Sequence, residues 1–279
     1  LRNGHMASPR EKVSSVLDPI WTALRQQAEA MAASEPTLAG FVHATILQHD
    51  RLEQALSYHL ARKLGGEDLS PLAIREMFDD AAAADSTIGQ AVRADLSAVF
   101  ERDPACHSYL DAFLFYKGFH ALECHRIAHW LWREGREAMA LFLQSRISQL
   151  FAVDVHPAAK IGRGIMFDHA TGIVIGETAV VEDDVSIMQD VTLGGTGKES
   201  GDRHPKIRRG VLLSLGAKVL GNIEVGEYSR VGAGSVVLKS VPPGCTAVGV
   251  PAKLVNCDCG ENPSQQMNHF IEELPDNTG

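Results

Sequence analysis

The stretch IRRGVLLSLGAKVLGNIEVGEYSRVGAGSVV (207–237) carries a branched apolar residue at every sixth position. These anchor positions are Ile207, Leu213, Val219, Val225, Val231 and Val237. A helix repeats every 3.6 residues and a flat strand every two, so neither structure explains a period of six. A chain that turns a corner after every six residues does explain it, because each face then points one apolar side chain inward. The stretch therefore predicts a parallel β-helix.

The same period continues upstream of this stretch. It runs through Val155, Ile161, Phe167 and Ile173 and, after a two-residue shift, through Ile175, Val181, Ile187 and Leu193. Three faces make one coil of about 18 residues, so the repeat from 155 to 242 predicts about four to five coils, spaced by about 4.8 Å. The repeat is interrupted once, by the polar and glycine-rich segment GGTGKESGDRHPK (194–206). Such an excursion from a regular repeat is where functional residues are expected.

The first half of the chain has a helical pattern, from about Ser14 to Leu150. Four-residue steps keep one apolar stripe on one face, as in Leu52, Leu56, Leu60 and Leu64. Prolines stand at three positions where a helix could begin, Pro36, Pro71 and Pro104, and Gly65 and Gly66 supply a stop. We expect about six to eight helices that cap one open end of the β-helix and cover its strand edges.

The predicted fold class is α+β, with an all-helical N-terminal domain followed by a β-helix. The expected boundaries are 11–151 for the helical domain and 152–256 for the β-helix, with the loop at 194–206. Residues 257–279 are polar and are predicted to form a flexible tail. The opening LRNGHM resembles a remnant of cloning, so residues 1–10 are left out of the fold prediction.

Composition excludes several classes of partner. The 279 residues carry a net charge of −9, which argues against nucleic acid as the main partner. No run of about 18 apolar residues exists, so no membrane span is expected. The cysteines are odd in number and irregularly spaced, which predicts no disulfide framework and a reduced, cytoplasmic setting. They are Cys106, Cys124, Cys245, Cys257 and Cys259.

Two groups of residues could bind a metal, but neither predicts a metal site. The pair Cys257 and Cys259 lacks a second pair at zinc-binding spacing. His125 and His129 stand four residues apart near His120, yet no further ligand follows at a convincing spacing. The sequence therefore predicts no metal.

Longer motifs connect both halves of the chain to one known family. In the repeat they are DVHPAAKIGRGIMFDHATGIVIGET (154–178), VTLGGTGKESGDRHPKI (191–207) and GVPAKLV (249–255). In the helical half they are RDPAC (102–106) and KGFHALECHRIAHWLW (117–132). These motifs closely resemble bacterial serine O-acetyltransferase, one of the hexapeptide-repeat acyltransferases. The resemblance implies a left-handed β-helix and transfer of an acetyl group from acetyl-CoA to L-serine, which gives O-acetyl-L-serine for cysteine biosynthesis.

The resemblance also implies an assembly and a regulation. Trimers with active sites between neighbouring β-helices would pair through the helical domains into a homohexamer, a dimer of trimers. L-Cysteine would act as a feedback inhibitor in the serine pocket. Members of the family often bind O-acetylserine sulfhydrylase through a C-terminal isoleucine, whereas this sequence ends in PDNTG.

His169 is the residue expected to act as the general base. A serine hydroxyl is a weak nucleophile near neutral pH, so its attack on a thioester needs a group that removes its proton. The family match pairs His169 with Asp154, whose carboxylate would hold the imidazole tautomer. Asp168 adjoins His169, and in an extended backbone the two side chains would point to opposite sides.

Five residues are expected to bind the acceptor. By resemblance, Asp168 and Asp103 contact the serine ammonium group, and Asp103 also suits a helix N-cap before Pro104, a role compatible with binding. Arg203 would clamp the carboxylate in two-point fashion. His204 would lie in the same pocket, with Glu177 as its partner.

A third set of residues is expected to contact CoA. Backbone N–H groups at Gly194 and Gly195 could stabilise the oxyanion of the thioester carbonyl. By resemblance, Gly195 and Thr196 contact the acetyl and pantetheine end, and a groove is lined by Leu215, Gly216 and Ala233. Lys239 and Lys253 could meet the CoA phosphates, or could simply be solvated lysines.

Three other functions stay open at this point. The chain could use a different acceptor, such as homoserine or a sugar. It could be a hexapeptide-repeat carbonic anhydrase, with zinc held by His156, His169 and His204 of neighbouring chains. It could also be a structural or partner-binding platform without catalysis.

Overall fold

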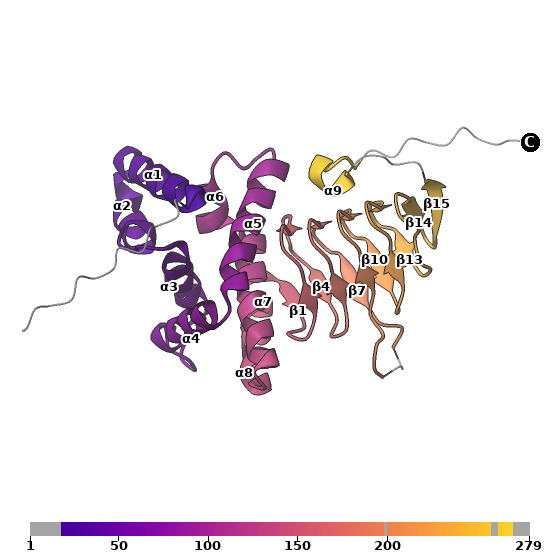
Figure 1. Ribbon diagram of the computed structural model, residues 1–279, viewed down its shortest axis with the longest axis horizontal. Helices are drawn as coiled ribbons and strands as arrows, with labels where there is room; N and C mark the ends of the chain where they lie inside the picture. Colours follow the sequence, from indigo (N-terminus) through magenta and orange to yellow (C-terminus); the bar gives the residue numbers. More distant parts are fainter. Residues whose placement is uncertain (1–17, 198–199, 258–261, 270–279) are drawn as a thin grey trace, which may run out of the picture.

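The computed structural model describes residues 18–197, 200–257 and 262–269. Helices fill the first half of the chain, and short strands arranged in coils fill the second (Figure 1). The helices are α1 (Pro19–Ser34), α2 (Pro36–Val42), η1 (His43–Leu47), α3 (Leu52–Leu64), α4 (Pro71–Ala84), α5 (Ser86–Arg102), α6 (Tyr109–Phe115), α7 (Lys117–Arg133) and α8 (Glu137–Phe151). The expected remnant at 1–10, Cys259 and residues 270–279 of the tail lie outside the described residues.

Most of the expected helix boundaries are confirmed. Pro36 and Pro71 occupy the first positions of α2 and α4, and Gly65 caps the end of α3. The expectation for Pro104 is wrong, because no helix begins there and the chain makes a turn after α5. The next helix, α6, starts at Tyr109 behind the N-cap Ser108, whose side chain accepts a hydrogen bond from Asp111 N.

The second half forms three parallel sheets that wrap into a β-helix. The sheets have the strand orders β1-β4-β7-β10-β13, β11-β8-β5-β2 and β14-β12-β9-β6-β3, the last extended by β15. The strands are β1 (Val153–Val155), β2 (Lys160–Ile161), β3 (Met166–Phe167), β4 (Ile173–Ile175), β5 (Val180–Val181), β6 (Ser186–Ile187), β7 (Thr192–Gly194), β8 (Lys206–Ile207), β9 (Leu212–Leu213), β10 (Lys218–Leu220), β11 (Glu224–Val225), β12 (Arg230–Val231), β13 (Val236–Val237), β14 (Thr246–Gly249) and β15 (Ala252–Asn256).

The register of the strands confirms the six-residue repeat as the cause of this fold. One column of paired anchors runs through Val155, Ile175, Leu193, Val219 and Val237. A second runs through Ile161, Val181, Ile207 and Val225, and a third through Phe167, Ile187, Leu213 and Val231. All of these side chains are buried except Ile161, which is partly buried. Each coil therefore adds one apolar residue per face to a continuous core.

The helical half covers the first coil of the β-helix, as the sequence predicts. In Figure 1, α5, α7 and α8 stand across the end formed by β1. At Gly118, α7 approaches the first coil so closely that only glycine fits. A Cβ at this position would lie 2.0 Å from the Phe167 carbonyl oxygen. Arg126 of the same helix donates to the carbonyl oxygen of Gly162 at 2.8 Å. The helices thus shield strand edges that would otherwise be open to pairing.

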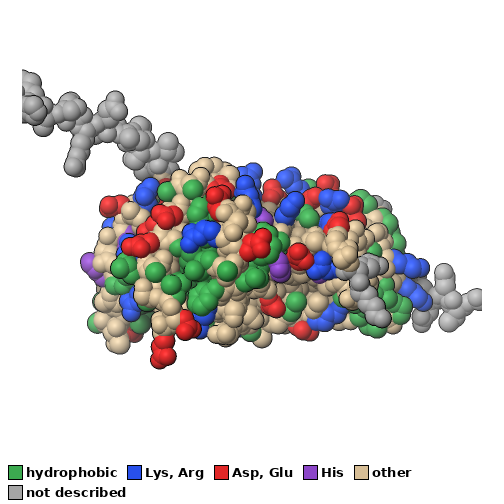
Figure 2. All heavy atoms as spheres, turned by 90° about the horizontal axis from the view of Figure 1, so that it is seen from below, with side chains coloured by type: hydrophobic (Ala, Val, Ile, Leu, Met, Phe, Trp, Pro, Cys, Tyr) green, Lys and Arg blue, Asp and Glu red, His purple; other side chains and the backbone are tan. Residues whose placement is uncertain are grey.

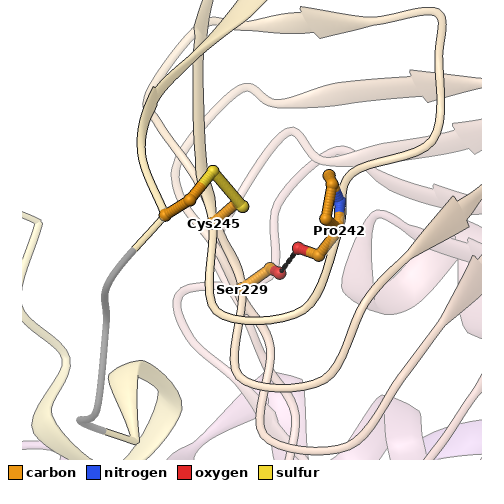
Figure 3. The surroundings of a disulfide bond; sticks show 4 residues. Ser229, Pro242 and Cys245 are labelled. Carbon is orange, nitrogen blue, oxygen red and sulfur yellow. Dashed lines mark hydrogen bonds between the residues drawn. A yellow bond between two sulfur atoms is a disulfide. The ribbon is translucent and has the colours of Figure 1, made fainter.

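A disulfide lies near the last coil, and it corrects the expectation that the cysteines stay unpaired. Cys245, just before β14, is bonded to Cys257, just after β15 (Figure 3). Their positions follow from the antiparallel pairing of β14 with β15, which brings Thr246 opposite Asn256. Nearby, the Ser229 hydroxyl donates to the carbonyl oxygen of Pro242 at 2.7 Å. The irregular spacing of the cysteines did not indicate this pair.

Part of the expected flexible tail is folded onto the protein. Residues Pro263–Gln266 form the short helix α9, which Figure 1 places beside α5 and above the first coils. Ser264 is fully buried there. Within the described residues, no helix is both long and apolar enough to span a membrane.

Candidate active site

The catalytic candidate His169 lies at a corner of the first coil, between β3 and β4. His169 and Ala170 have φ values of 52° and 61°, so the chain turns there in the left-handed region. The corner is closed by Thr171 N, which donates to the carbonyl oxygen of His169 at 2.8 Å. The His169 side chain is 74% exposed, so its imidazole projects from the corner toward solvent.

Asp168 lies beside His169, and Asp103 is close enough to Asp168 to influence its pKa. We name these three residues the His169 corner: Asp103, Asp168 and His169. Asp168 Oδ1 lies 3.9 Å from His169 Nε2, and the Asp168 side chain is only 16% exposed. Burial raises the pKa of Asp168, the charge of His169 lowers it, and nearby Asp103 raises it again. The corner thus combines an exposed imidazole with a shielded carboxylate that a cationic partner would stabilise.

Two expectations about this corner need correction. Asp168 and His169 do not point to opposite sides, because His169 is not in an extended conformation and its ring stays near Asp168. Asp103 is not a helix N-cap, because it follows α5 and its Oδ1 accepts from Ala105 N at 2.8 Å within a turn. The Asp103 carboxylate therefore belongs to the turn after α5, where its charge raises the pKa of Asp168.

A second cluster lies at a different edge, where the loop after β7 returns to the coil. We name it the Arg203 corner: Glu177, Arg203 and His204. Thr178 Oγ1 accepts from Arg203 N at 3.0 Å and from His204 N at 3.1 Å. The imidazole Nδ1 of His204 in turn lies 2.9 Å from Thr178 Oγ1 and accepts from Thr178 N. One threonine therefore anchors both loop residues, a role that nothing in the sequence pattern indicated.

Gly176 makes room for the ring of His204. A Cβ at this position would lie 2.0 Å from His204 Nε2, so a larger residue would displace the imidazole. His204 is only 7% exposed, and burial lowers its pKa, with the charge of Arg203 adding to the effect. The structure therefore holds His204 as a neutral imidazole near neutral pH.

Glu177 pairs with Arg203 and not, as expected, with His204. Arg203 Nη2 lies 2.6 Å from Glu177 Oε2, and this bond lowers the pKa of Glu177. The ring of His204 has Thr178 as its partner instead. Glu177 binds the Arg203 guanidinium, which is charged and so is a stronger donor than a neutral imidazole. The Arg203 guanidinium is thus held in place by a carboxylate.

Asp154 has a partner other than His169 in the single chain. Its Oδ1 accepts from Gln144 Nε2 of α8 at 2.7 Å. Among the residues described, no hydrogen bond or ion pair joins Asp154 to His169. Asp154 instead lies close enough to His156 to raise its pKa, which burial lowers more strongly. The family match pairs Asp154 with His169, and in the single chain the described partner of the Asp154 carboxylate is Gln144 instead.

The expected CoA contacts also divide between two edges. Leu215, Gly216 and Ala233 lie at corners stacked above that of His169. Backbone hydrogen bonds join these corners from one coil to the next. Asp190 N donates to the Thr171 carbonyl oxygen at 2.8 Å, Gly216 N to that of Gln189 at 2.9 Å, and Gly234 N to that of Leu215 at 2.8 Å. Gly195 and Thr196 instead follow β7, and the backbone of Gly195 runs beside Arg203.

The two predicted lysines lie toward the last coils. Lys239 is exposed after β13, and Lys253 is exposed on β15, opposite Val248. Both belong to the same end of the β-helix as the corner of Ala233. Their exposure leaves both ammonium groups open to an anionic group.

The histidines weighed as metal ligands have other partners or surroundings. His129 Nδ1 lies 2.7 Å from the carbonyl oxygen of Pro157, and His120 Nε2 lies 2.8 Å from that of Phe113. Burial lowers the pKa of His125 well below its ordinary value. Over the described ranges, no group of three or more His, Cys, Asp or Glu side chains is arranged to hold a metal ion.

The β-helix of six-residue steps, with its helical cap and polar corners, defines a hexapeptide-repeat acyltransferase. Residues 20–124 match the family model described as serine acetyltransferase, N-terminal. A serine acetyltransferase of Salmonella typhimurium is 57% identical over 255 residues, which cover 91% of this chain and 93% of that protein. The chain belongs to the serine acetyltransferase family.

Solved structures agree with this assignment. A serine acetyltransferase of Brucella abortus strain S19 in complex with coenzyme A is 52% identical, with a TM-score of 0.85, over 86% of this chain and 96% of that one. A serine acetyltransferase in complex with cysteine is 52% identical, with a TM-score of 0.89, over 91% of this chain and 98% of that one. Membership of this family excludes the carbonic anhydrase and the non-catalytic platform.

Proposed function

We propose that the protein transfers an acetyl group from acetyl-CoA to the hydroxyl of L-serine, with His169 as the general base. The observation that carries the proposal is the His169 corner, where an exposed imidazole projects beside a shielded carboxylate. The relatives supply the reaction, since they are serine acetyltransferases and one is solved with coenzyme A. Acetyl-CoA is the co-substrate in this proposal, and no metal takes part.

The reaction needs a base and a site for the developing charge. His169 accepts the proton of the serine hydroxyl as its oxygen attacks the thioester carbonyl. The C–S bond then breaks, the new ester bond remains, and the proton on His169 passes to the CoA thiolate. Backbone N–H groups at Gly194 and Gly195 stabilise the oxyanion that forms between these steps.

The two corners suit the two charged ends of an amino acid. Asp168 and Asp103 offer carboxylates to the serine ammonium group. Arg203 offers a planar guanidinium to the carboxylate, which would share it with Glu177. His204 lies beside Arg203 as a neutral wall of the pocket. On the cofactor side, Leu215, Gly216 and Ala233 line the CoA groove, and Lys239 and Lys253 lie near its phosphates.

A complete site then requires two chains. The His169 corner and the Arg203 corner lie at different edges of the sheet β1-β4-β7-β10-β13, so a neighbouring β-helix would bring them together. The same contact would supply Asp154 to His169. We therefore propose a trimer with three such sites.

The trimers would pair through the helical region, residues 11–151, into a hexamer. Figure 2 shows hydrophobic side chains gathered over the helical half of one face, with acidic and basic side chains interspersed around them. Among residues 18–151, the large exposed hydrophobic side chains are Leu72, Phe100, Phe115, Leu141 and Leu150. Such residues favour association between chains.

Regulation and cellular context complete the proposal. L-Cysteine differs from serine in one atom and would compete for the same pocket as a feedback inhibitor, as the solved complex of a relative with cysteine supports. The enzyme would work in the cytoplasm and could bind O-acetylserine sulfhydrylase through the native C-terminus. A pull-down with the full-length terminus tests that last interaction.

An acetyl-CoA-dependent assay across several acceptors tests the function. CoA release should be rapid with L-serine and far slower with homoserine and with amino sugars. Saturating L-cysteine should suppress the reaction. Preferential acetylation of homoserine or a sugar would overturn the proposal, because Asp103, Asp168 and Arg203 would then not select serine.

A further inference from the structure

The junction between α8 and β1 brings a helix side chain, Gln144, onto the first strand of the β-helix. α8 ends at Phe151, and Ala152 caps it in the left-handed conformation with a φ of 55°. The chain changes direction at this one residue, because β1 already begins at Val153. The tight junction places Gln144 Nε2 2.7 Å from Asp154 Oδ1, although ten residues separate the two in the sequence.

The Asp154 carboxylate lies on the outer face of this strand. Its neighbours Val153 and Val155 are buried inside the coil, whereas Asp154 itself is only partly buried. Successive side chains of a strand alternate between its two faces, so Asp154 projects away from the core of the coil. Because α8 packs against β1, Gln144 meets the carboxylate on that outer face.

The bond from Gln144 occupies only one oxygen of Asp154. An ionised carboxylate can only accept hydrogen bonds, so the amide must present its NH2 group to it. Among the residues that the structure describes, Asp154 Oδ2 has no hydrogen-bond or ion-pair partner. His156, two residues further on, uses its Nδ1 to accept from Ala158 N at 3.1 Å, and its ring packs against Trp132. The second oxygen of Asp154 is therefore available to an imidazole of another chain.

We propose that Gln144 is a positioning residue for acetyl transfer, whose amide holds Oδ1 of Asp154 so that Oδ2 faces the imidazole of His169. This inference rests on the proposed function, in which Asp154 of one chain supports His169 of a neighbouring chain as the general base. A carboxylate fixed in this way maintains the imidazole tautomer and stabilises the imidazolium that forms when the serine proton arrives. Gln144 acts through Asp154 and contacts neither substrate, so its effect belongs to turnover and not to binding.

Gln144→Met tests this bond with little change of shape, because methionine has a similar length and bulk but no donor. In steady-state kinetics with L-serine and acetyl-CoA, kcat should fall roughly tenfold, since a hydrogen bond to a charged group is lost. The KM values for both substrates should change less than about twofold. Gln149→Met is the matched control on the same helix. Gln149 is exposed and its amide bonds to Arg146 and Ser145, so its replacement should leave kcat and both KM values unchanged.

A double-mutant cycle with Asp154→Ala shows whether Gln144 acts through this carboxylate. Once Asp154 is replaced, Gln144→Met should lower kcat by less than about a further factor of two. The inference would be overturned by an unchanged kcat in Gln144→Met, by an equal fall in Gln149→Met, or by a rise of KM at constant kcat. A further tenfold loss in the Asp154→Ala background would also overturn it, because Gln144 would then act independently of Asp154. Failure of the parent chain to acetylate serine would instead overturn the proposed function.

Discussion

The catalytic claim rests on one side chain whose removal should leave the fold intact. His169→Ala should lower kcat by a factor of about 10²–10⁴, the usual contribution of a general base. The fold should persist because the side chain is 74% exposed. Acetyl-transfer kinetics, together with circular dichroism and thermal unfolding, check both parts. Retention of near-parental kcat would contradict the role of His169.

A single glycine holds the second corner open. Gly176→Ala places a Cβ 2.0 Å from His204 Nε2, so the ring must move and release Thr178. We expect kcat/KM for serine to fall and the free energy of unfolding to fall by roughly 1–3 kcal/mol. Urea unfolding and steady-state kinetics measure the two effects.

Gly40→Ala is the control for this change. Gly40 lies within α2 and has open space around the site of a Cβ, so alanine there should be neutral or stabilising. If Gly176→Ala behaved like Gly40→Ala, His204 would not depend on the space that Gly176 provides.

At this scale the sequence predicted residue types better than their partners. It singled out His169, Asp168 and Arg203, because they lie in motifs that resemble the family and because a base, a carboxylate and a guanidinium suit the chemistry. It could not predict that Glu177 binds Arg203 or that Thr178 holds His204. Those contacts depend on how the loop 195–205 folds back, which no periodicity describes.

Among the elements, the junction between α5, α7 and the first coil contains a buried charged triad. Arg126 Nη2 lies 2.5 Å from Asp95 Oδ2, and Arg126 Nε lies 3.4 Å from Glu123 Oε2. Asp95 also contacts the coil, since its Oδ1 accepts from Ile165 N at 2.7 Å. Burial, then the Asp95 charge, raises the pKa of Glu123 well above its ordinary value. Two carboxylates share one guanidinium, so Glu123 keeps its proton to a higher pH than a solvated glutamate does.

This arrangement predicts how stability depends on pH. The folded protein keeps a proton on Glu123 that the unfolded chain loses above about pH 4.5, so this group's contribution to stability falls as pH rises toward the raised pKa. Glu123→Gln is neutral at every pH and should remove that loss. Its melting temperature should exceed that of the parent by several degrees at pH 8 and by less at pH 5.5.

Exposed Glu134, just after α7, supplies the control. Glu134→Gln should shift the melting temperature equally and only slightly at both pH values, because its side chain faces solvent. If the difference in melting temperature between Glu123→Gln and the parent were the same at pH 5.5 and at pH 8, the raised pKa of Glu123 would be contradicted.

The elements themselves were largely predictable. A period of six identifies coil anchors because each coil must bury the same face, and prolines mark the starts of α2 and α4. Pro104 was misleading, because proline also suits a turn after a helix. The disulfide Cys245–Cys257 and the docked helix α9 were missed, since both depend on where the chain end returns in space.

For the whole molecule, the separation of the two corners matters most. The sequence predicted their residues through family motifs, but a linear pattern cannot tell which residues meet within a chain and which meet between chains. The His169 corner and the Arg203 corner lie at different sheet edges, and Asp154 is bonded to Gln144. We therefore infer that a working site needs a second copy of the chain.

Complementation between two inactive variants tests this claim most directly. His169→Ala chains and Arg203→Ala chains should each be nearly inactive alone. Unfolded and refolded together in equal amounts, they should form mixed trimers in which about one quarter of the sites combine an intact His169 with an intact Arg203. The mixture should recover about that fraction of parental serine acetylation. A mixture of exchanged subunits no more active than either variant alone would contradict it.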